Sequence, residues 1–246
     1  MTWRSREAGI IKSCVLGAAL VAGMASTAHA DPKLTLAGSA SFTTDYMFRS
    51  ISNTKNDPAV QPEFDLTYGM FFFTLWGSNT SFGNNIELDY YGGIAPKWKD
   101  VTFTLAGNAY TYPGSDNIDY FELHTGAAWA QGPWSLALND YWSPDNFQTF
   151  GQSNAIEGDW GYTFSNKIWN FFTPSISGAI GFQSYEKVAS DYTYWNVGLT
   201  FGFMKNWSAD VRYYDTTYNE DQCFVNTGNS RTACDARAVG TIKVTF

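Results

Sequence analysis

The stretch TDYMFRSIS, residues 44–52, places an acid and a base, Asp45 and Arg49, four positions apart among aromatic and aliphatic neighbours. In a helix these two side chains would meet as an ion pair. In a strand they would share a face but lie about 13 Å apart, so each would need another partner. The flanking residues alternate with period two, which favours the strand. One face then carries Phe42, Thr44, Tyr46 and Phe48, and the other Thr43, Asp45, Met47 and Arg49.

A second group with possible chemistry is His124, which lies two positions after Glu122. A serine or aspartate hydrolase that needs a general base would have to use this histidine, because the only other one, His29, lies in the first thirty residues. In an alternating segment it shares a face with Glu122, in the middle of the strand. A polar lining is the more common role for such a histidine, so we expect no enzyme and no cofactor.

Cys223 and Cys234 flank the loop-forming tract VNTGNSRTA, and the third cysteine, Cys14, lies near the amino terminus. In an oxidising compartment the two would form one disulfide that pins a loop. A metal site is the weaker interpretation, since two thiolates without neighbouring histidines leave a tetrahedral ion half coordinated. We therefore expect a disulfide and no metal.

Residues 1–30 have the pattern of a cleaved secretory signal: a basic start, the apolar run CVLGAALVAGM and an A-x-A step before Asp31. The apolar run is too short for a membrane anchor, which needs about 20 residues. The chain has 15 basic and 23 acidic residues. Removing three bases and one acid with the signal leaves 12 against 22, a net charge of −10. Such acidity makes nucleic acid an unsuitable partner and favours cations.

Residues 31–246 divide into segments of about 10 residues, the length of a tilted transmembrane strand. We predict an all-β, antiparallel transmembrane β-barrel of about twelve strands. A soluble β-sandwich is the alternative. The predicted strands are 34–50, 60–68, 70–79, 85–95, 101–112, 118–130, 133–143, 154–164, 173–185, 191–203, 207–217 and 236–246. The last one, ARAVGTIKVTF, has one apolar face and ends on Phe246. It resembles the closing strand of outer-membrane barrels, whose terminal aromatic residue is recognised by the assembly machinery.

The connections between these segments alternate between longer polar ones, such as NTKNDPA, and tight or basic ones, such as QGP or SNKIWN. This asymmetry is typical of an outer-membrane barrel with both termini in the periplasm. Aromatic residues gather at segment ends, which predicts two interfacial girdles. The inner one would contain Trp98, Trp134, Trp169, Phe171 and Trp207, and the outer one Tyr46, Phe48, Tyr112, Tyr141, Trp142, Tyr192, Tyr213 and Tyr214.

Charged side chains on the alternating faces must point into the barrel, because Arg or Lys in mid-bilayer costs about 2 to 4 kcal/mol. The predicted lumen therefore has nine acids, four bases and His124. They are Asp45, Glu63, Asp65, Glu87, Asp89, Glu122, Glu157, Asp159 and Asp210, with Arg49, Arg212, Arg237 and Lys243. Nine acids cannot all pair with four bases, so we expect a pore that prefers cations. A closed, salt-bridged barrel filled by Trp76, Tyr91, Tyr110 and Tyr120 is the alternative.

The segment TTDYMFRSISNTKNDPAVQ, residues 43–61, resembles the first strand and loop of the TorF family of porin-type proteins, which read T-S-D-Y-x-F-R-G-I-S-Q-T followed by D-P-A-V-Q. The likeness extends to Trp76, IELDYYGG, TYPGSD and CDAR, and so covers nearly all of residues 31–246. Ser50 and Asn53 depart from the pattern, where glycine and glutamine are usual. The resemblance implies an outer-membrane barrel and names no solute.

Together these features predict a porin-like channel in the outer membrane of a Gram-negative bacterium, passing small cationic or neutral solutes. Its partners would be membrane lipids, lipopolysaccharide and the barrel assembly machinery; the oligomeric state is open. Within the barrel we expect Arg49 to lie near Gln61 and Glu63 on the next strand, and Asp45 to face Arg237 across the closing seam.

Overall fold

The computed structural model describes residues 33–228 and 230–246, and these form a closed antiparallel β-barrel. Twelve long strands make up its wall within these ranges, each antiparallel to its neighbours. They are β1 (Leu34–Thr43), β4 (Ala59–Tyr68), β5 (Phe71–Asn79), β6 (Ile86–Ile94), β8 (Val101–Thr111), β9 (Tyr120–Gln131), β10 (Trp134–Ser143), β11 (Ser153–Thr163), β12 (Thr173–Tyr185), β13 (Tyr192–Phe203), β14 (Trp207–Thr216) and β15 (Arg237–Thr245). The predicted signal segment, residues 1–30, lies outside the described residues.

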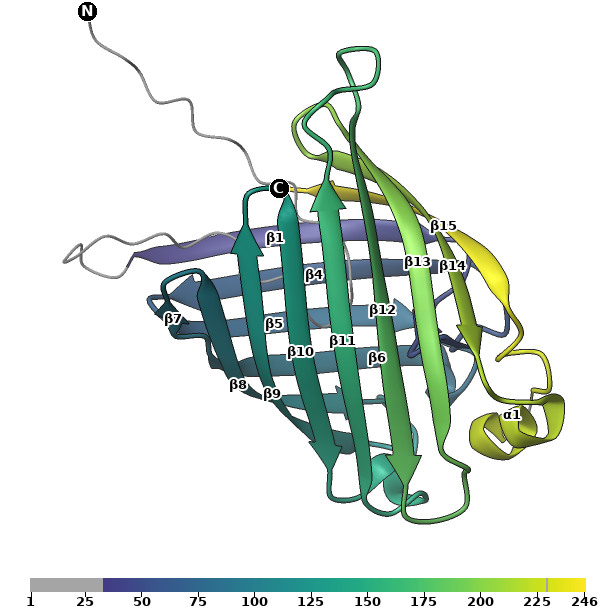
Figure 1. Cartoon of the computed structure of the whole chain (residues 1–246). Helices are drawn as coiled ribbons and strands as arrows, with labels where there is room; N and C mark the ends of the chain where they lie inside the picture. Colours follow the sequence, from purple (N-terminus) through teal and green to yellow (C-terminus); the bar gives the residue numbers. More distant parts are fainter. Residues whose placement is uncertain (1–32, 229) are drawn as a thin grey trace, which may run out of the picture.

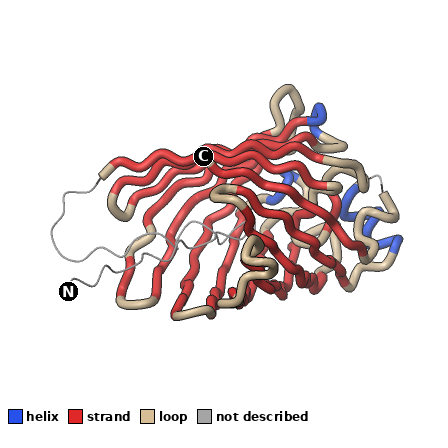
Figure 2. The backbone as a smooth tube through the Cα atoms, turned by 90° about the horizontal axis from the view of Figure 1, so that it is seen from above, coloured by secondary structure: helices blue, strands red, loops and turns tan. Residues whose placement is uncertain are grey.

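Strand neighbours in sequence are also neighbours in the sheet, and the last strand returns to the first. β6 pairs with β8, and β15 pairs with β1, so the ring has no open edge. Figure 1 shows β10 to β13 crossing in front of β1, β4, β5 and β6, and Figure 2 shows the same wall from above. The two-residue β7 (Lys97–Trp98) only extends the pairing of β8. The prediction of an all-β barrel of twelve strands is confirmed.

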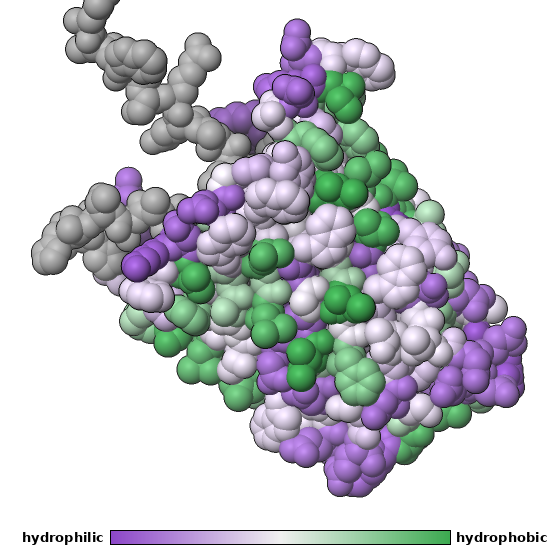
Figure 3. Space-filling model, viewed as in Figure 1, coloured by the Kyte–Doolittle hydropathy of each residue, from purple (hydrophilic) through white to green (hydrophobic). Residues whose placement is uncertain are grey.

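The strands alternate between an apolar outer face and a polar inner face. In β4, Phe64 is exposed outside while Glu63 and Asp65 face inside, as period-two geometry requires. Other exposed outer side chains include Phe73, Leu75, Phe103, Leu105, Leu136, Leu138, Ile180, Phe182, Leu199 and Val211. Figure 3 shows apolar residues over the strands and hydrophilic ones at the ends. An apolar belt around a polar interior defines a transmembrane barrel.

In the described ranges the helical segments are α1 (Glu220–Thr227) and the short 3-10 turns η1 (Gly83–Asn85) and η2 (Asn146–Gln148). None of these is long and apolar enough to cross a membrane.

The seam between β15 and β1 is closed by the last residue. Phe246 exchanges two backbone hydrogen bonds with Gly38, each with an N···O distance of 2.9 Å. Its ring lies over Gly38 so closely that a Cβ there would come within 2.6 Å of Cε2. A side chain at this position would therefore displace the ring of Phe246 from its place against β1.

The connections divide the barrel into two ends. One end, here called the turn end, has the connections 69–70, 95–100, 132–133, 164–172 and 204–206 and the carboxyl terminus. The other, the loop end, has 44–58, 80–85, 112–119, 144–152, 186–191 and 217–236, the last of which contains α1. The alternation predicted from sequence is present, and the basic connection SNKIWN lies within 164–172, the longest connection of the turn end. Which end faces the periplasm stays a prediction.

Eleven of the twelve predicted strands agree with the structure to within two residues, and the first one does not. The predicted strand 34–50 ends at Thr43, because the chain leaves the wall there and folds into the barrel. Residues beyond Asp45 form a separate hairpin, β2 (Met47–Phe48) and β3 (Ile51–Ser52). The stretch TDYMFRSIS, residues 44–52, therefore lies after the end of β1, and its alternation belongs to a bend and the hairpin of β2 and β3.

The predicted outer aromatic girdle is largely wrong. Tyr46, Tyr112, Tyr141 and Tyr192 are buried inside the barrel, since they occupy inner positions of their strands or the folded-in segment. Of the outer set, Trp142 and Tyr213 are exposed, at 36% and 40%. At the turn end the predicted girdle residues are all exposed: Trp98, Trp134, Trp169, Phe171 and Trp207.

Candidate functional site

The segment between β1 and β4, residues 44–58, folds into the barrel and is here called the plug. Its tip, Arg49, reaches the far wall and binds Glu122 of β9 through both terminal nitrogens, each with an N···O distance of 2.8 Å. The same guanidinium donates to Gln183 of β12 at 2.8 Å and lies over the rings of Phe48 and Tyr141. The expected position of Arg49 near Gln61 and Glu63 is therefore wrong: the hairpin carries it across the lumen.

The plug tip is a tight turn in which both central residues have left-handed backbone angles, with φ of 46° at Arg49 and 60° at Ser50. Hairpins of this kind normally use glycine or asparagine, and the TorF pattern has glycine at the second position. Ser50 lacks that freedom, but its hydroxyl donates to the carbonyl oxygen of Trp195 on β13 at 3.0 Å. The contacts of these two side chains with the far wall offset the cost of their backbone angles.

The base of the plug is fixed through Asp45. Its Oδ1 accepts hydrogen bonds from Ser52 at 2.6 Å and Thr54 at 2.8 Å, and its Oδ2 binds Arg237 of β15 at 3.0 Å. Asp45 therefore pairs with Arg237 across the seam between the first and last strands, as expected from the sequence. Tyr46 beside it donates to Glu87 of β6 at 3.0 Å. The plug is thus attached to the wall on both sides of the seam.

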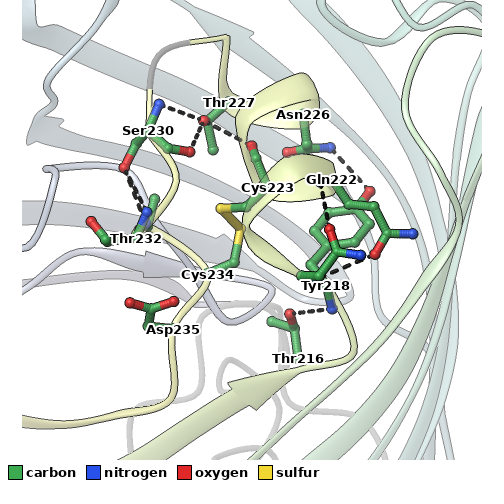
Figure 4. The surroundings of a disulfide bond; sticks show 12 residues. Thr216, Tyr218, Gln222, Cys223, Asn226, Thr227, Ser230, Thr232, Cys234 and Asp235 are labelled. Carbon is green, nitrogen blue, oxygen red and sulfur yellow. Dashed lines mark hydrogen bonds between the residues drawn. A yellow bond between two sulfur atoms is a disulfide. The ribbon is translucent and has the colours of Figure 1, made fainter.

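The loop that carries the disulfide packs against the plug. The predicted Cys223–Cys234 bond is present and joins α1 to the segment before β15, as Figure 4 shows. Both cysteines are buried with Ile51 of the plug and with Tyr192 and Tyr218. The backbone amide of Ser52 donates to the carbonyl of Ala233 at 2.8 Å, which ties the hairpin directly to this loop. The disulfide therefore stabilises the surface against which the plug lies.

α1 and the tyrosine beside it complete this loop. Asn219 and Gln222 form a reciprocal capping box at the start of the helix, and Gly228 ends it with a φ of 71°. Tyr218 donates to the carbonyl of Ser190 and accepts from Asn226. Burial raises the pKa of Tyr218 well above its ordinary value, so the hydroxyl remains a donor at physiological pH.

The structure places all fourteen sequence-selected lumen residues inside the barrel wall, on inner strand positions or on the plug. Each of the four bases pairs with a different acid. The pairs are Arg49–Glu122, Arg212–Asp210, Arg237–Asp45 and Lys243–Glu63, with N···O distances of 2.8, 3.2, 3.0 and 3.3 Å. Thr74 donates to Asp65 at 2.7 Å.

Four acids form no ion pair within the described part of the chain: Glu87, Asp89, Glu157 and Asp159. They form two pairs of alternate residues, one on β6 beside the plug and one on β11. Asp159 is partly exposed, whereas Glu87 is 1% exposed. The acids without an ion-pair partner are therefore on β6 and β11, and Asp159 is the most accessible of the four.

His124 lies in a chain of hydrogen bonds across β6, β9, β10 and β11. Nδ1 lies 2.5 Å from the hydroxyl of Tyr91, and Nε2 lies 2.9 Å from Oδ1 of Asn139, whose Nδ2 donates to Asp159 at 2.8 Å. Because Oδ1 can only accept, Nε2 carries a hydrogen, and in the neutral ring Nδ1 accepts from Tyr91. Both ring nitrogens therefore form hydrogen bonds with other residues of the wall. Across residues 33–228 and 230–246, no three His, Cys, Asp or Glu side chains cluster as metal ligands would.

Access to water differs between the two ends along β9 and β10. Toward the loop end, the inner side chains of Glu122, Tyr141 and Ser143 are buried. Toward the turn end, the inner positions carry small residues, and Ala130 and Ser135 are exposed. Water therefore reaches the inner wall from the turn end, and the plug with its surrounding rings fills the loop-end half.

Sequence reasoning did not find several residues that position the charges. Gln183 is fully buried and binds the tip of the plug. Gly198 leaves room for the side chain of Arg212, which crosses β13 to bind Ser177 and Asn196. A glycine on the inner face of a strand was a usable signal of such a close approach. The partner of Arg49 was missed because the fold-back of residues 44–58 is a tertiary feature.

The fold and its lining define a porin-like transmembrane β-barrel. A family model described as a bacterial protein of unknown function (Gcw_chp) matches residues 27–246, so the chain belongs to this family. Among curated proteins, none matches the sequence. This match does not test membership of the TorF family, which stays a prediction.

Solved structures with a similar fold include two of KdgM porin and one of NanC porin. KdgM porin is 10% identical, with 85% of this chain and 99% of that chain covered and a TM-score of 0.56. KdgM porin in complex with disordered oligogalacturonate is also 10% identical, with 86% of this chain and 99% of that chain covered and a TM-score of 0.57. NanC porin is 12% identical, with 86% of this chain and 99% of that chain covered and a TM-score of 0.52. At such low identity the similarity establishes the fold.

Proposed function

We propose that this protein is a diffusion channel of the bacterial outer membrane that passes small cationic or neutral solutes. The observation that carries the proposal is the charge of the lumen: nine inward acids face four bases, and four of the acids have no ion-pair partner in the described residues. A wall of net negative charge in a narrow, low-dielectric passage attracts cations and repels anions. The porin fold supports the channel class.

The orientation and partners follow from the same proposal. Both termini lie on the periplasmic side of a Gram-negative outer membrane, with the turn end inside and the loop end outside. Phe246 acts as the assembly signal, consistent with its position on the closing seam. Lipids and lipopolysaccharide surround the apolar belt. The resemblance of residues 43–61 to the TorF pattern supports membership of that porin-type family.

The acidic lumen also bears on the choice of solute. The KdgM complex holds oligogalacturonate, which is a polyanion. The Glu157 and Asp159 pair on β11 would repel such a solute. We therefore propose a different solute class for this chain despite the shared fold.

A closed barrel with a structural or adhesive role is the second candidate, and the plug is the observation that favours it. The plug carries Arg49 to Glu122 on the far wall, and the buried cluster of Tyr110, Tyr112 and Tyr120 packs against Phe48 of the plug. If the plug never moves, it obstructs the loop-end half of the lumen. Catalysis has less support, since both nitrogens of His124 are used within the wall network.

The test is conductance and ion selectivity of the refolded protein in a planar bilayer, measured across a salt gradient. We expect discrete conductance steps. The sign of the reversal potential should be that of a cation-selective channel. Glu157→Gln combined with Asp159→Asn should reduce that potential, because it removes two acids that form no ion pair in the described residues, one of which, Asp159, is partly exposed. Glu220→Gln on exposed α1 is the matched control and should not change it. Well-folded barrels without conductance would support the closed barrel, and anion selectivity would refute the charge argument.

A further inference from the structure

A cavity of about 400 Å³ lies at the loop end, above the tip of the plug. It is bounded by the plug hairpin, the connections 80–85, 112–119, 144–152 and 186–191, and the loop that carries α1. Its volume falls within the range of small-molecule sites. Neither Glu157 nor Asp159, the proposed selectivity groups of the channel, belongs to its lining.

Aromatic rings form most of one side of this cavity. Phe147 packs against both Phe82 and Phe150, with ring centroids 6.1 Å apart in each pair, and both pairs are edge-to-face. Phe48 from the plug and Tyr185 from β12 complete the apolar lining. Flat apolar walls held by edge-to-face packing suit a planar or ring-containing body.

The charged groups of the cavity are both basic. Among the described residues, its lining contains Arg49 and Lys55 and no acid, although the whole chain has a net charge of −8. Arg49 is already neutralised by Glu122 below. Lys55 is exposed and forms no ion pair in the described part of the chain. The cavity therefore has one available positive charge beside an apolar wall.

We propose that this cavity binds a small organic monoanion with an aromatic or apolar body. The acid group would lie at Lys55, and the ring would lie among Phe82, Phe147 and Phe150. The side-chain amides of Asn53 and Asn226 line the same space and supply polar contacts that orient a ligand. Bound there, the molecule lies directly over the plug tip.

Three probes that share one body and differ in charge test the proposal: indole-3-acetate, indole-3-acetamide and tryptamine. Binding to the folded full-length mature chain in detergent is measured by isothermal titration calorimetry, which requires no conductance. We expect indole-3-acetate to bind about threefold more tightly than the amide, as one partly exposed charge pair allows, and tryptamine to bind most weakly. Failure of the channel proposal would leave this result unaffected.

Two variants assign the binding to the cavity. Lys55→Gln should remove the preference for the acid over the amide and leave the affinity for the amide unchanged. Phe147→Ala should weaken both by about tenfold through lost ring packing. Lys187→Gln is the control, because Lys187 lies at the loop end but outside the lining. Tryptamine binding as tightly as the acid, an acid preference that survives Lys55→Gln, or no binding of any probe would each overturn the proposal.

Discussion

Arg49→Gln is the change that most directly tests whether the plug closes the lumen. In the structure the guanidinium makes two hydrogen bonds to Glu122, one to Gln183 and two ring contacts, at side-chain exposures of 7% for Arg49 and 1% for Glu122. Glutamine removes the charge and cannot reproduce the bidentate geometry. With the plug in place, Glu122 would be left as a buried carboxylate without its counter-ion.

The magnitude follows from burial. Removing one partner of a buried ion pair costs about 3 to 5 kcal/mol, because the remaining charge stays unsolvated. This cost applies only while the plug is in place, since its departure lets water reach Glu122. Each 1.4 kcal/mol changes an equilibrium tenfold. The ratio of closed to open plug should therefore fall by a factor on the order of one hundred or more.

The assay is single-channel recording in planar bilayers, which reports the fraction of time in each conductance level. We expect Arg49→Gln to spend far more time in the highest level than the wild type. Arg231→Gln is the matched control, because Arg231 pairs with Asp221 at exposures of 52% and 85%. An exposed pair of this kind contributes about 0 to 1 kcal/mol. Equal open fractions in the two variants would refute the assignment of Arg49 as the residue that holds the plug.

Two further outcomes are expected from the contacts around the plug and the wall. Replacing Cys223 and Cys234 together by serine should raise hydrogen exchange at the Ser52 amide, measured by mass spectrometry, because a crosslink of this loop length contributes about 3 kcal/mol; unchanged exchange would show that the loop holds the plug without it. Gly198→Ala should lower the temperature at which the folded barrel loses its heat-modifiable gel mobility, since the new Cβ would lie 2.9 Å from Arg212. Gly158→Ala, with 4.0 Å to its nearest neighbour, is the control, and equal transition temperatures would contradict the packing argument.

Most of the wall was predictable because it obeys a local rule. Each strand must alternate between lipid and lumen, so the sequence of β4 or β15 shows which side chains face inward without knowledge of any neighbour. The strand count, the inward set and the Cys223–Cys234 bond follow from such local patterns. The helix α1 was not predicted, because its capping residues lie within a tract that has the composition of a loop.

The residues by themselves determined an acidic chain with twelve alternating segments and a charged inner face, since period-two alternation and the cost of charge in lipid act strand by strand. Only the tertiary structure decided what Arg49 does. Its partner Glu122 lies 73 positions away in sequence and is reached because residues 44–58 turn inward instead of extending β1. Whether such a segment extends a strand or crosses the lumen depends on its contacts with the opposite wall. The period-two alternation of its residues is the same in both cases, so the sequence pattern does not distinguish them.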